Sequence, residues 1–288
     1  MRINFPKTGF IVKGTEDILI PPMLKVKQKF NDLKIKDIER HLNNKLNNAI
    51  DNKEWYQDKN ICITAGSRGI ANIDLILKII IDKLKIWGAN PFIIPAMGSH
   101  GGATAEGQKE MLSTFNITEK SMGVKIFSSM DVVKYSSLDD GTPLYIDKYA
   151  YNSDGIVVVN RVKPHTDFRG KHESGLAKMI AIGLAKHVGA SMFHMKGFNT
   201  FAERIPQVCN RFLENCPVAF GVGIVENAYD KVCNLEVIAK EKILETDAAL
   251  LEIAKKNMPR FKYPHMDVII IDEIGKNISG AGFDPNIV

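Results

Sequence analysis

The chain has 288 residues, of which 45% are hydrophobic and 25% are charged. This length and balance predict a folded protein of one large or two modest domains, and they exclude intrinsic disorder and fibrous repeats. The net charge of +5 is too small to indicate nucleic-acid binding, which depends on a concentrated basic face. Because MRINFPKTGFIVKG lacks the apolar run of a signal peptide, and charged residues interrupt the longest apolar runs, we expect a cytoplasmic protein without a membrane-spanning segment.

The first half of the chain predicts alternating helices and strands. Residues 24–50 mix charged and spaced apolar positions, which indicates a helix that ends near the asparagine-rich NNKLNN. From Asn60 a β-rich run ends in glycine, a helix follows from Asn72 to Gly88, and PFIIPAMG predicts a second strand. A strand, a helix and a strand in this order form a βαβ unit. We therefore expect an α/β fold, with a mainly parallel sheet flanked by helices and functional loops at the carboxyl ends of its strands.

The loop after the second strand, GSHGGATAEG, places three glycines around His100 before a helix that begins near Ala103 or Thr104. Such a loop lets backbone amides approach a phosphate or a carboxylate. Further along, VKIFSS, VVKYSS and DGIVVVNRV predict strands. SGLAKMIAIGLAKHVGA predicts one helix, with Ser174 as its N-cap and its end near Gly189.

The last third predicts an amphipathic helix in FAERIPQVCNRFLE, strands in VAFGVGIVE and CNLEVIAKE, and a helix in DAALLEIAKKNM. FKYPHMD has the composition of a linker, and VIIIDEIGKNISGAGFDPNIV predicts a strand and a glycine loop. We expect residues 1–262 to form a large N-terminal domain. Residues 263–288 would form a linker and the beginning of an incomplete second α/β domain.

Three candidate residues lie where predicted strands end: Arg68 in AGSRG, His100 in GSHGG and His165 in KPHTDF. Because the ends of parallel strands meet at one edge of a sheet, these side chains are expected to share a cleft. Arg68 would be either a carboxylate clamp or half of a surface ion pair. Each histidine would be either an acid or base or a residue of a turn.

The run RVKPHTDFRGKHESGLAKMIAIGLAKHVGASMFH holds two further candidates. Lys178 stands among small and apolar residues, so its amine either reaches solvent or has a partner. His194 is either a core histidine bonded to a carbonyl or a metal ligand. Three other histidines are expected to face solvent: His41, His172 and His187.

The same run is basic, which is typical of an anion pocket but also of a solvated loop. Two acids accompany six basic residues, namely Arg161, Lys163, Arg169, Lys171, Lys178 and Lys186. A zinc hydrolase would need three or four protein ligands, and the spacing of His165, His172 and His194 matches no usual zinc motif. The cysteines, Cys62, Cys209, Cys216 and Cys233, form no Cys-x-x-Cys pair and are expected as buried thiols.

Taken together, the motifs resemble the lactate racemase family, whose members use a nickel-pincer nucleotide cofactor. In that family an arginine loop, a Gly-Thr-His loop, a Pro-His motif, a Ser-Gly-Gly-x-Lys motif and a later histidine follow one another. From Ile61 onward GSRG, GSHGG, KPH, SGLAK and MFH stand in this order. The resemblance implies an isomerase that racemises or epimerises a small anionic 2-hydroxy acid by moving a hydride to the cofactor and back.

The resemblance also implies roles for individual residues. His100 and His165 would be the acid/base pair, one on each face of the substrate carbon. Arg68 and Lys276 would bind the substrate carboxylate.

The cofactor would be held by the second half of the basic run. Lys178 would be its attachment point, and His194 would bind nickel in a planar set of donors. The remaining contacts to the cofactor are expected at Ser67, Gly98, Gly101 and Ser174.

The chain departs from the family pattern at Ala65, where an acidic residue is usual, at Ser67, where a threonine is usual, and at Leu176, where the second glycine of the lysine motif is usual. The link TDFRGKHE after His165 is longer than usual. Its basic residues, Arg169 and Lys171, would select a larger or more acidic hydroxy acid.

An alternative from another class is a non-catalytic protein that binds or carries a nucleotide-like anion through the GSHGG loop. An enzyme needs both His100 and His165, whereas a carrier tolerates the loss of either. The sequence leaves the oligomeric state open.

Overall fold

The structure is a computed structural model that describes residues 24–263, 265–275, 278–279 and 281–287, together with Lys13 and Pro22. A five-stranded sheet with the order β2-β1-β5-β6-β7 lies at its centre. β1, β2, β5 and β6 run parallel, and β7 pairs antiparallel with β6. The strands are β1 (Asn60–Ala65), β2 (Asn90–Pro95), β5 (Gly155–Arg161), β6 (Val218–Glu226) and β7 (Val232–Ala239). The expected α/β fold with a mainly parallel sheet is confirmed.

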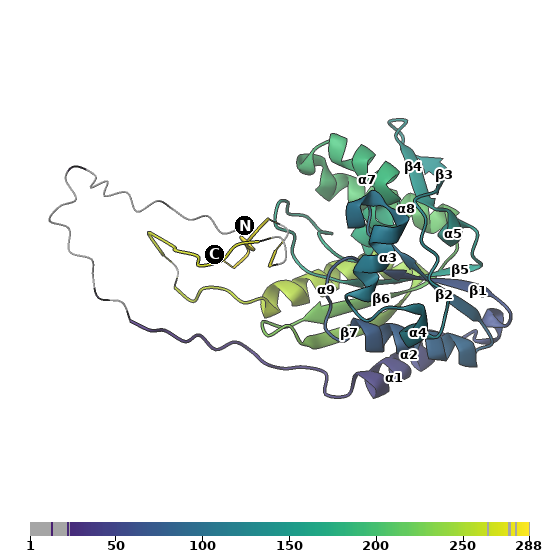
Figure 1. The fold of residues 1–288 in the computed structure, drawn as a ribbon, viewed down its shortest axis with the longest axis horizontal. Coiled ribbons are helices and arrows are strands. Elements are labelled where there is room, and N and C mark those ends of the chain that lie inside the picture. Colours follow the sequence, from purple (N-terminus) through teal and green to yellow (C-terminus); the bar gives the residue numbers. More distant parts are fainter. Residues whose placement is uncertain are drawn as a thin grey trace.

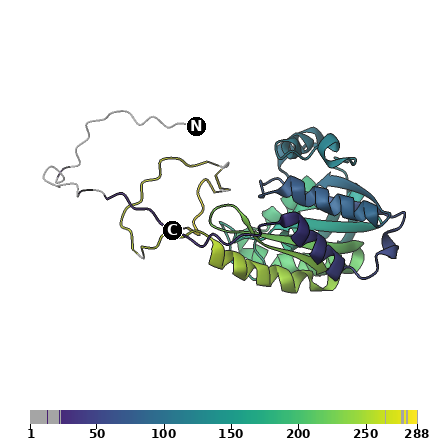
Figure 2. The same ribbon diagram turned by 90° about the horizontal axis from the view of Figure 1, so that it is seen from below.

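Helices cover both faces of this sheet (Figures 1 and 2). Because successive side chains of a strand point to opposite faces, Ile61 and Ile63 join one core while Cys62 joins the other. The first core contains residues of α1 (Ile38–Ala49) and α2 (Ile73–Ile86). The second core contains residues of α6 (Leu176–Lys178), α7 (Lys186–Met195), α8 (Phe201–Asn215) and α9 (Ile243–Asn257).

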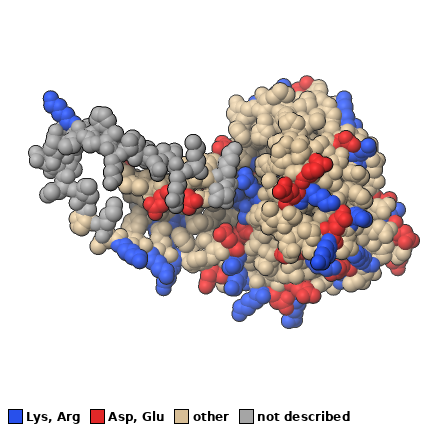
Figure 3. All heavy atoms as spheres, viewed as in Figure 1, with Lys and Arg blue, Asp and Glu red and all other residues tan. Residues whose placement is uncertain are grey.

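A second, two-stranded antiparallel sheet consists of β3 (Val132–Ser137) and β4 (Pro143–Asp147). The expected strand in VKIFSS is wrong, because this stretch makes only an isolated bridge between Ile126 and Ile93. The shorter helices are α3 (Ala105–Ser113), α4 (Glu119–Met122) and α5 (Lys148–Tyr151). On the face drawn in Figure 3, acidic and basic side chains are interspersed.

The first helix begins later than its charge pattern predicts. Residues 24–37 are not helical, and α1 starts after Asp37, whose side chain accepts a hydrogen bond from the Arg40 amide at 2.9 Å. The helix also continues through NNKLNN, because Leu42 and Leu46 are fully buried on either side of its first asparagines. Tertiary packing therefore overrides the low helix propensity of asparagine.

The single helix predicted between Ser174 and Gly189 is wrong, because the chain bends there by 102°. α6 passes into a π-helical turn, Met179–Gly183, before α7 leaves in a new direction. The corner is built around Lys186, which has a φ of +53° and a fully buried side chain. Its Nζ donates to the Pro95 carbonyl at 2.6 Å and lies 3.0 Å from Asp147 Oδ2.

Ser174 is not the N-cap of this helix. It forms an antiparallel bridge with Lys163, and Gly175 occupies the cap position.

Among the residues that the structure describes, no single helix is long and apolar enough to cross a membrane. The two helical stretches on either side of the 102° bend, Leu176–Gly183 and Lys186–Met195, reach that length and composition only together.

The described residues after α9 contain no helix or strand, so the strand expected in VIII does not form; Val268 and Ile270 are each 80% exposed. This segment and the one before α1 extend to the same side of the molecule (Figures 1 and 2). There the Lys262 amide donates to Gln28 Oε1 at 2.7 Å. Further along, the segment returns to the domain, where Asp284 lies 3.4 Å from Lys163. The expected boundary at residue 263 stays a prediction.

Candidate active site

Loops from three neighbouring strands meet at the carboxyl edge of the sheet. β1 pairs with both β2 and β5, so the loops that carry Ser67, His100 and His165 leave the same edge. Ser67 Oγ and His100 Nδ1 are joined by a short hydrogen bond. Arg68 follows Ser67 in the chain, and its charge lowers the pKa of both Lys178 and Lys163, which lie after β5. The strand-end loops therefore leave one edge of the sheet, whereas a cleft shared by Arg68, His100 and His165 stays a prediction.

The glycines around His100 adopt positive φ values, and at Gly101 packing within the chain also requires glycine. Gly101 has a φ of +66°, and a methyl group there would lie 2.7 Å from the Gln108 amide nitrogen. Gly98 also has a positive φ, and its amide donates to the Gly183 carbonyl at 3.1 Å. The buried Gln108 holds the loop, since its Nε2 donates to the carbonyls of Gly98 and His100 at 2.9 and 3.2 Å. Sequence inspection missed Gln108, a polar residue without a distinguishing motif.

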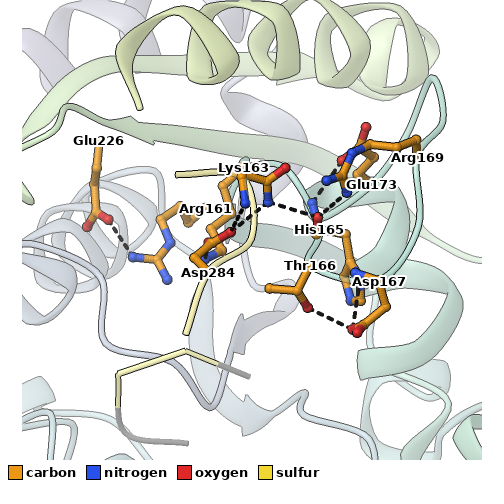
Figure 4. A network of polar contacts seen from close by, with 10 residues as sticks. Arg161, Lys163, His165, Thr166, Asp167, Arg169, Glu173, Glu226 and Asp284 are labelled. Atoms are coloured by element: carbon orange, nitrogen blue, oxygen red, sulfur yellow. Dashed lines mark hydrogen bonds and ion pairs between the residues drawn. The ribbon is translucent and has the colours of Figure 1, made fainter. Parts of the chain in front are cut away.

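The loop after β5 fixes the ring of His165. Its amide donates to Glu173 Oε2 at 2.8 Å, and its Nδ1 accepts from the Asp167 amide at 3.1 Å (Figure 4). Because Nδ1 accepts this bond, the neutral ring carries its proton on Nε2. Burial, followed by the charge of Lys178, lowers the pKa of His165 to about 4. The imidazole is therefore neutral at pH 7.

Lys178 lies on α6 with its Nζ 6.0 Å from the centre of the Phe168 ring. Burial, followed by the charge of Arg68, lowers the pKa of Lys178 to about 8. The sequence left open whether this amine reaches solvent or has a partner. In the structure it is buried beside the Phe168 ring and close to the charge of Arg68. With this pKa about a tenth of the amine is uncharged at pH 7, far more than for an ordinary lysine, so it can act as a nucleophile.

His194 is exposed on α7, so the interpretation as a core histidine is wrong. Its ring centre lies 5.1 Å from Phe201 and 5.4 Å from Phe198. Partial burial, followed by the charge of Lys178, lowers the pKa of His194. A neutral imidazole with an accessible edge offers a lone pair to a metal.

An aromatic cluster joins His165, Lys178 and His194. It consists of Phe168, Phe198 and Phe201, and the Phe201 ring contacts both of the others. The His165 ring lies 4.5 Å from Phe168 and 6.1 Å from Phe198. The three candidate residues of the basic run therefore surround one apolar surface.

Several basic residues of the run have structural partners. Lys186 is buried beside Asp147, and Arg161 forms a short ion pair with Glu226 (Figure 4). Arg169 Nη1 donates to the carbonyls of His165 and Phe168 at 2.6 and 3.1 Å.

The remaining basic residues differ in their surroundings. Lys171 is exposed and acts on Glu245, whose pKa is lowered mainly by Lys242. Burial and Arg161 lower the pKa of Lys163, while Asp284 opposes them. The cations whose charges lower the pKa of Lys178 are Arg68 and Lys163.

The expectation that His172 faces solvent is wrong. The ring is 3% exposed, and its Nδ1 lies 3.0 Å from Asp247 Oδ2. His41 is only half-buried, with Nε2 3.1 Å from the Leu235 carbonyl, whereas His187 is exposed as expected. The partner of His172 is 75 residues away in the chain, which no local pattern could indicate.

Three further residues that sequence inspection missed support the His165 loop. Glu173 is 1% exposed and pairs with Lys255 of α9 at 3.4 Å. Asp247 lies on the buried face of α9, in helical register with Leu250 and Ala254. The sequence pattern that could have identified Asp247 is a carboxylate in the middle of an otherwise apolar helix face.

A cavity of about 390 Å³ lies between the end of β5 and the C-terminal segment. Arg161, Lys163, Phe283 and Asp284 are among its lining residues. Lys276, expected to bind substrate, lies outside the described residues. The described part of the chain holds no group of three or more histidine, cysteine, aspartate or glutamate side chains arranged for a metal, so a zinc site made by protein ligands alone has no candidate there.

The fold and site define an α/β protein with a lysine, an arginine and histidines gathered at the carboxyl edge of its sheet. Residues 16–204 match the lactate racemase N-terminal domain, and because this is more than half of the chain, the protein belongs to that family.

The fold is similar to that of the lactate racemase apoprotein from Thermoanaerobacterium thermosaccharolyticum, with a TM-score of 0.57 and 19% sequence identity. The similarity covers 81% of this chain and 60% of that chain. The chain thus spans about 60% of the length of this relative, and the likeness shows the fold alone. No match was found among curated proteins.

Proposed function

We propose that the protein is a cytoplasmic racemase or epimerase of a small anionic 2-hydroxy acid that works with a nickel-pincer nucleotide. The observation that carries this proposal is the gathering of His165, Lys178 and His194 around one aromatic cluster. Arg68 acts on the same lysine, which supports a site for an anionic substrate close to that for a cofactor.

Lys178 and His194 fit the cofactor. An amine with a pKa of about 8 can form a covalent bond near neutral pH. An exposed imidazole with a lowered pKa can donate its lone pair to nickel. The organic part of the cofactor would supply the other donors to nickel. When bound, the cofactor supplies a reversible hydride acceptor.

The protein side chains would orient the substrate and move its proton. Arg68 would bind the carboxylate through a bidentate contact. Loss of a hydride from the substrate carbon and of the hydroxyl proton to a histidine gives a planar 2-keto acid. Return of the hydride to the opposite face of the keto carbon, and of a proton to its oxygen, inverts the centre, and the two directions would use acid/base groups on two sides. His100 and His165 would supply them, with each ring fixed at Nδ1 by a neighbour and Nε2 meeting the substrate oxygen.

The alternative of an anion carrier finds less support in the GSHGG loop. The amides of Gly98, His100, Ala103 and Thr104 donate to carbonyls within the chain. These amides therefore already have acceptors, which weakens the case for a phosphate cradle built from the loop backbone.

The test is to produce the protein, with any remaining part of its chain, in cells that make the cofactor. We expect bound nickel, visible absorption, and stereochemical exchange on a panel of 2-hydroxy acids. His100→Ala and His165→Ala should each abolish exchange, while His187→Ala, which alters an exposed histidine, should not. Colourless, metal-free protein, or exchange that persists in both active-site variants, would refute the proposal.

The preference for a more acidic substrate has its own test. The guanidinium of Arg169 lies at the His165 carbonyl, whereas Lys171 acts on Glu245, so only the first charge is close to the acid/base residue. Arg169→Ala should lower the rate on dicarboxylic hydroxy acids relative to lactate, and Lys171→Ala should not. Unchanged ratios in both variants would end the hypothesis that this loop selects acidic substrates.

A further inference from the structure

Two buried carboxylates hold the segment from His165 to Lys178 in place. Glu173, within the segment, and Asp247, on α9, are each 1% exposed. Glu173 accepts from the His165 amide, so it fixes the start of the segment. The other end, where α6 begins, depends on Asp247.

Asp247 joins two parts of the segment through its two oxygens. Oδ1 accepts from the Leu176 amide at 2.6 Å, and Oδ2 lies 3.0 Å from His172 Nδ1. Both oxygens therefore have partners, as a buried carboxylate requires. These contacts tie the first turn of α6 to the loop that precedes it.

Gly175 gives the carboxylate access to the Leu176 amide. Its φ of −176° is extended backbone that any residue adopts, so conformation does not require glycine there. The requirement is spatial, because a methyl group at this position would lie 2.1 Å from Asp247 Oδ1. The Asp247 carboxylate therefore occupies the space that a side chain at position 175 would need.

We propose that Asp247 is a positioning residue that fixes the first turn of α6 and thereby places the Lys178 amine beside Phe168 and His165. Lys178 is two residues beyond the bonded Leu176 amide, on the same short helix. The catalytic consequence of this placement rests on the proposed function, whereas the placement of the amine does not.

The direct test measures where the Lys178 amine lies by its reactivity. Acetic anhydride labels uncharged amines, and mass spectrometry of the Lys178 peptide across a pH series gives the midpoint of labelling. The wild-type midpoint is expected near the pKa of about 8. In Asp247→Ala the amine should move toward solvent, and the midpoint should rise by about one unit or more toward the ordinary lysine value of about 10.4.

Two variants separate geometry from charge. Asp247→Asn keeps an oxygen for the Leu176 amide and a nitrogen for His172, so its midpoint should stay within about half a unit of wild type. Asp247→Glu keeps the charge but displaces the contact, and its midpoint should rise. Glu245→Gln, an exposed change on the same helix, is the matched control and should leave the midpoint unchanged. The charged groups that act on the amine, Arg68, Lys163 and Asp167, are the same in all variants.

A labelling midpoint in Asp247→Ala equal to that of wild type would overturn the proposal. If Asp247→Ala does not fold, Asp247→Glu gives the same decision, and an unchanged midpoint there would overturn it too. In the loaded enzyme, Asp247→Ala should lower kcat at least about tenfold with little change in KM, and Asp247→Asn should restore most of it. A shifted midpoint in a protein whose wild type racemises nothing would refute the proposed function and leave the positioning role of Asp247 standing.

Discussion

One buried amine influences both histidines of the aromatic cluster. The charge of Lys178 follows burial as a cause of the lowered pKa of His165 and of His194. Any reaction that removes this charge therefore makes both rings more basic. Covalent attachment at Lys178 would be such a reaction, so loading of the site and the proton affinity of His165 are linked.

Replacing Lys178 by methionine tests this link. The variant keeps most of the side-chain volume but loses the charge, so the pKa of His165 should rise from about 4 part of the way toward 6.5. Titration of the histidine ring signals by NMR measures this value. Lys171→Met, which removes an exposed charge from the same run, should not change it. Equal values in wild type and Lys178→Met would show that the charge of Lys178 does not contribute to the pKa of His165.

His165 also makes stability depend on pH. Its pKa is 6.5 in an unfolded chain and about 4 in the folded protein, so in this window the unfolded chain binds more protons. The free energy of unfolding should therefore fall as the pH drops from 6.5 to 4, by at most about 3 kcal/mol from this residue. Urea unfolding across the window should show a steeper fall for wild type than for His165→Asn. Parallel curves would contradict the low pKa.

At the scale of elements, a buried ion pair lies at the corner between α6 and α7. Lys186, the first residue of α7, and Asp147, the last residue of β4, are both fully buried. A buried charge that loses its partner is strongly destabilising. The bend in this stretch of helix is therefore specified by a contact across the fold.

Lys186→Met should lower the free energy of unfolding by about 3–5 kcal/mol, because Asp147 would remain as an uncompensated buried charge. Adding Asp147→Asn should recover part of the loss. Lys242→Met breaks an exposed pair with Glu245 and should lower the free energy of unfolding much less. Urea denaturation of the three variants measures these differences, and similar losses for both lysines would argue against a structural role of the corner pair.

The elements with a clear local pattern could be predicted from the sequence, and those shaped by distant contacts could not. The strands of the central sheet and α2 follow from apolar runs and turn residues, and Arg68, His100 and His165 follow from their places after strands. The corner at Lys186 and the burial of His172 depend on residues far away in the chain. For the same reason Gln108 and Asp247 were not recognised as supports of the site.

At the scale of the whole molecule, the C-terminal segment lies against the same edge of the sheet as the candidate site. Asn286 Nδ2 donates to the His165 carbonyl at 3.0 Å, and Asp284 pairs with Lys163. The segment therefore contacts the loop of an acid/base candidate while most of its length is exposed. Among its described residues, Asp284 and Asn286 supply the polar contacts to this edge.

Asp284→Ala should loosen this attachment. Loss of one ion pair of this kind is worth on the order of 1 kcal/mol, so limited proteolysis within residues 259–275 should speed up about fivefold. Asp267→Ala, which alters an exposed carboxylate of the same segment, is the control. Identical cleavage rates would mean that other contacts hold the segment in place.

The buried Lys186 has a consequence for hydrogen exchange. Its Nζ also donates to Gln108 Oε1 at 3.2 Å, and Gln108 in turn holds the carbonyls of Gly98 and His100. The helix corner and the His100 loop are thereby joined through two side chains. Their amides should become accessible to deuterium together, as one unit of local opening, although nearly 80 residues of chain separate them.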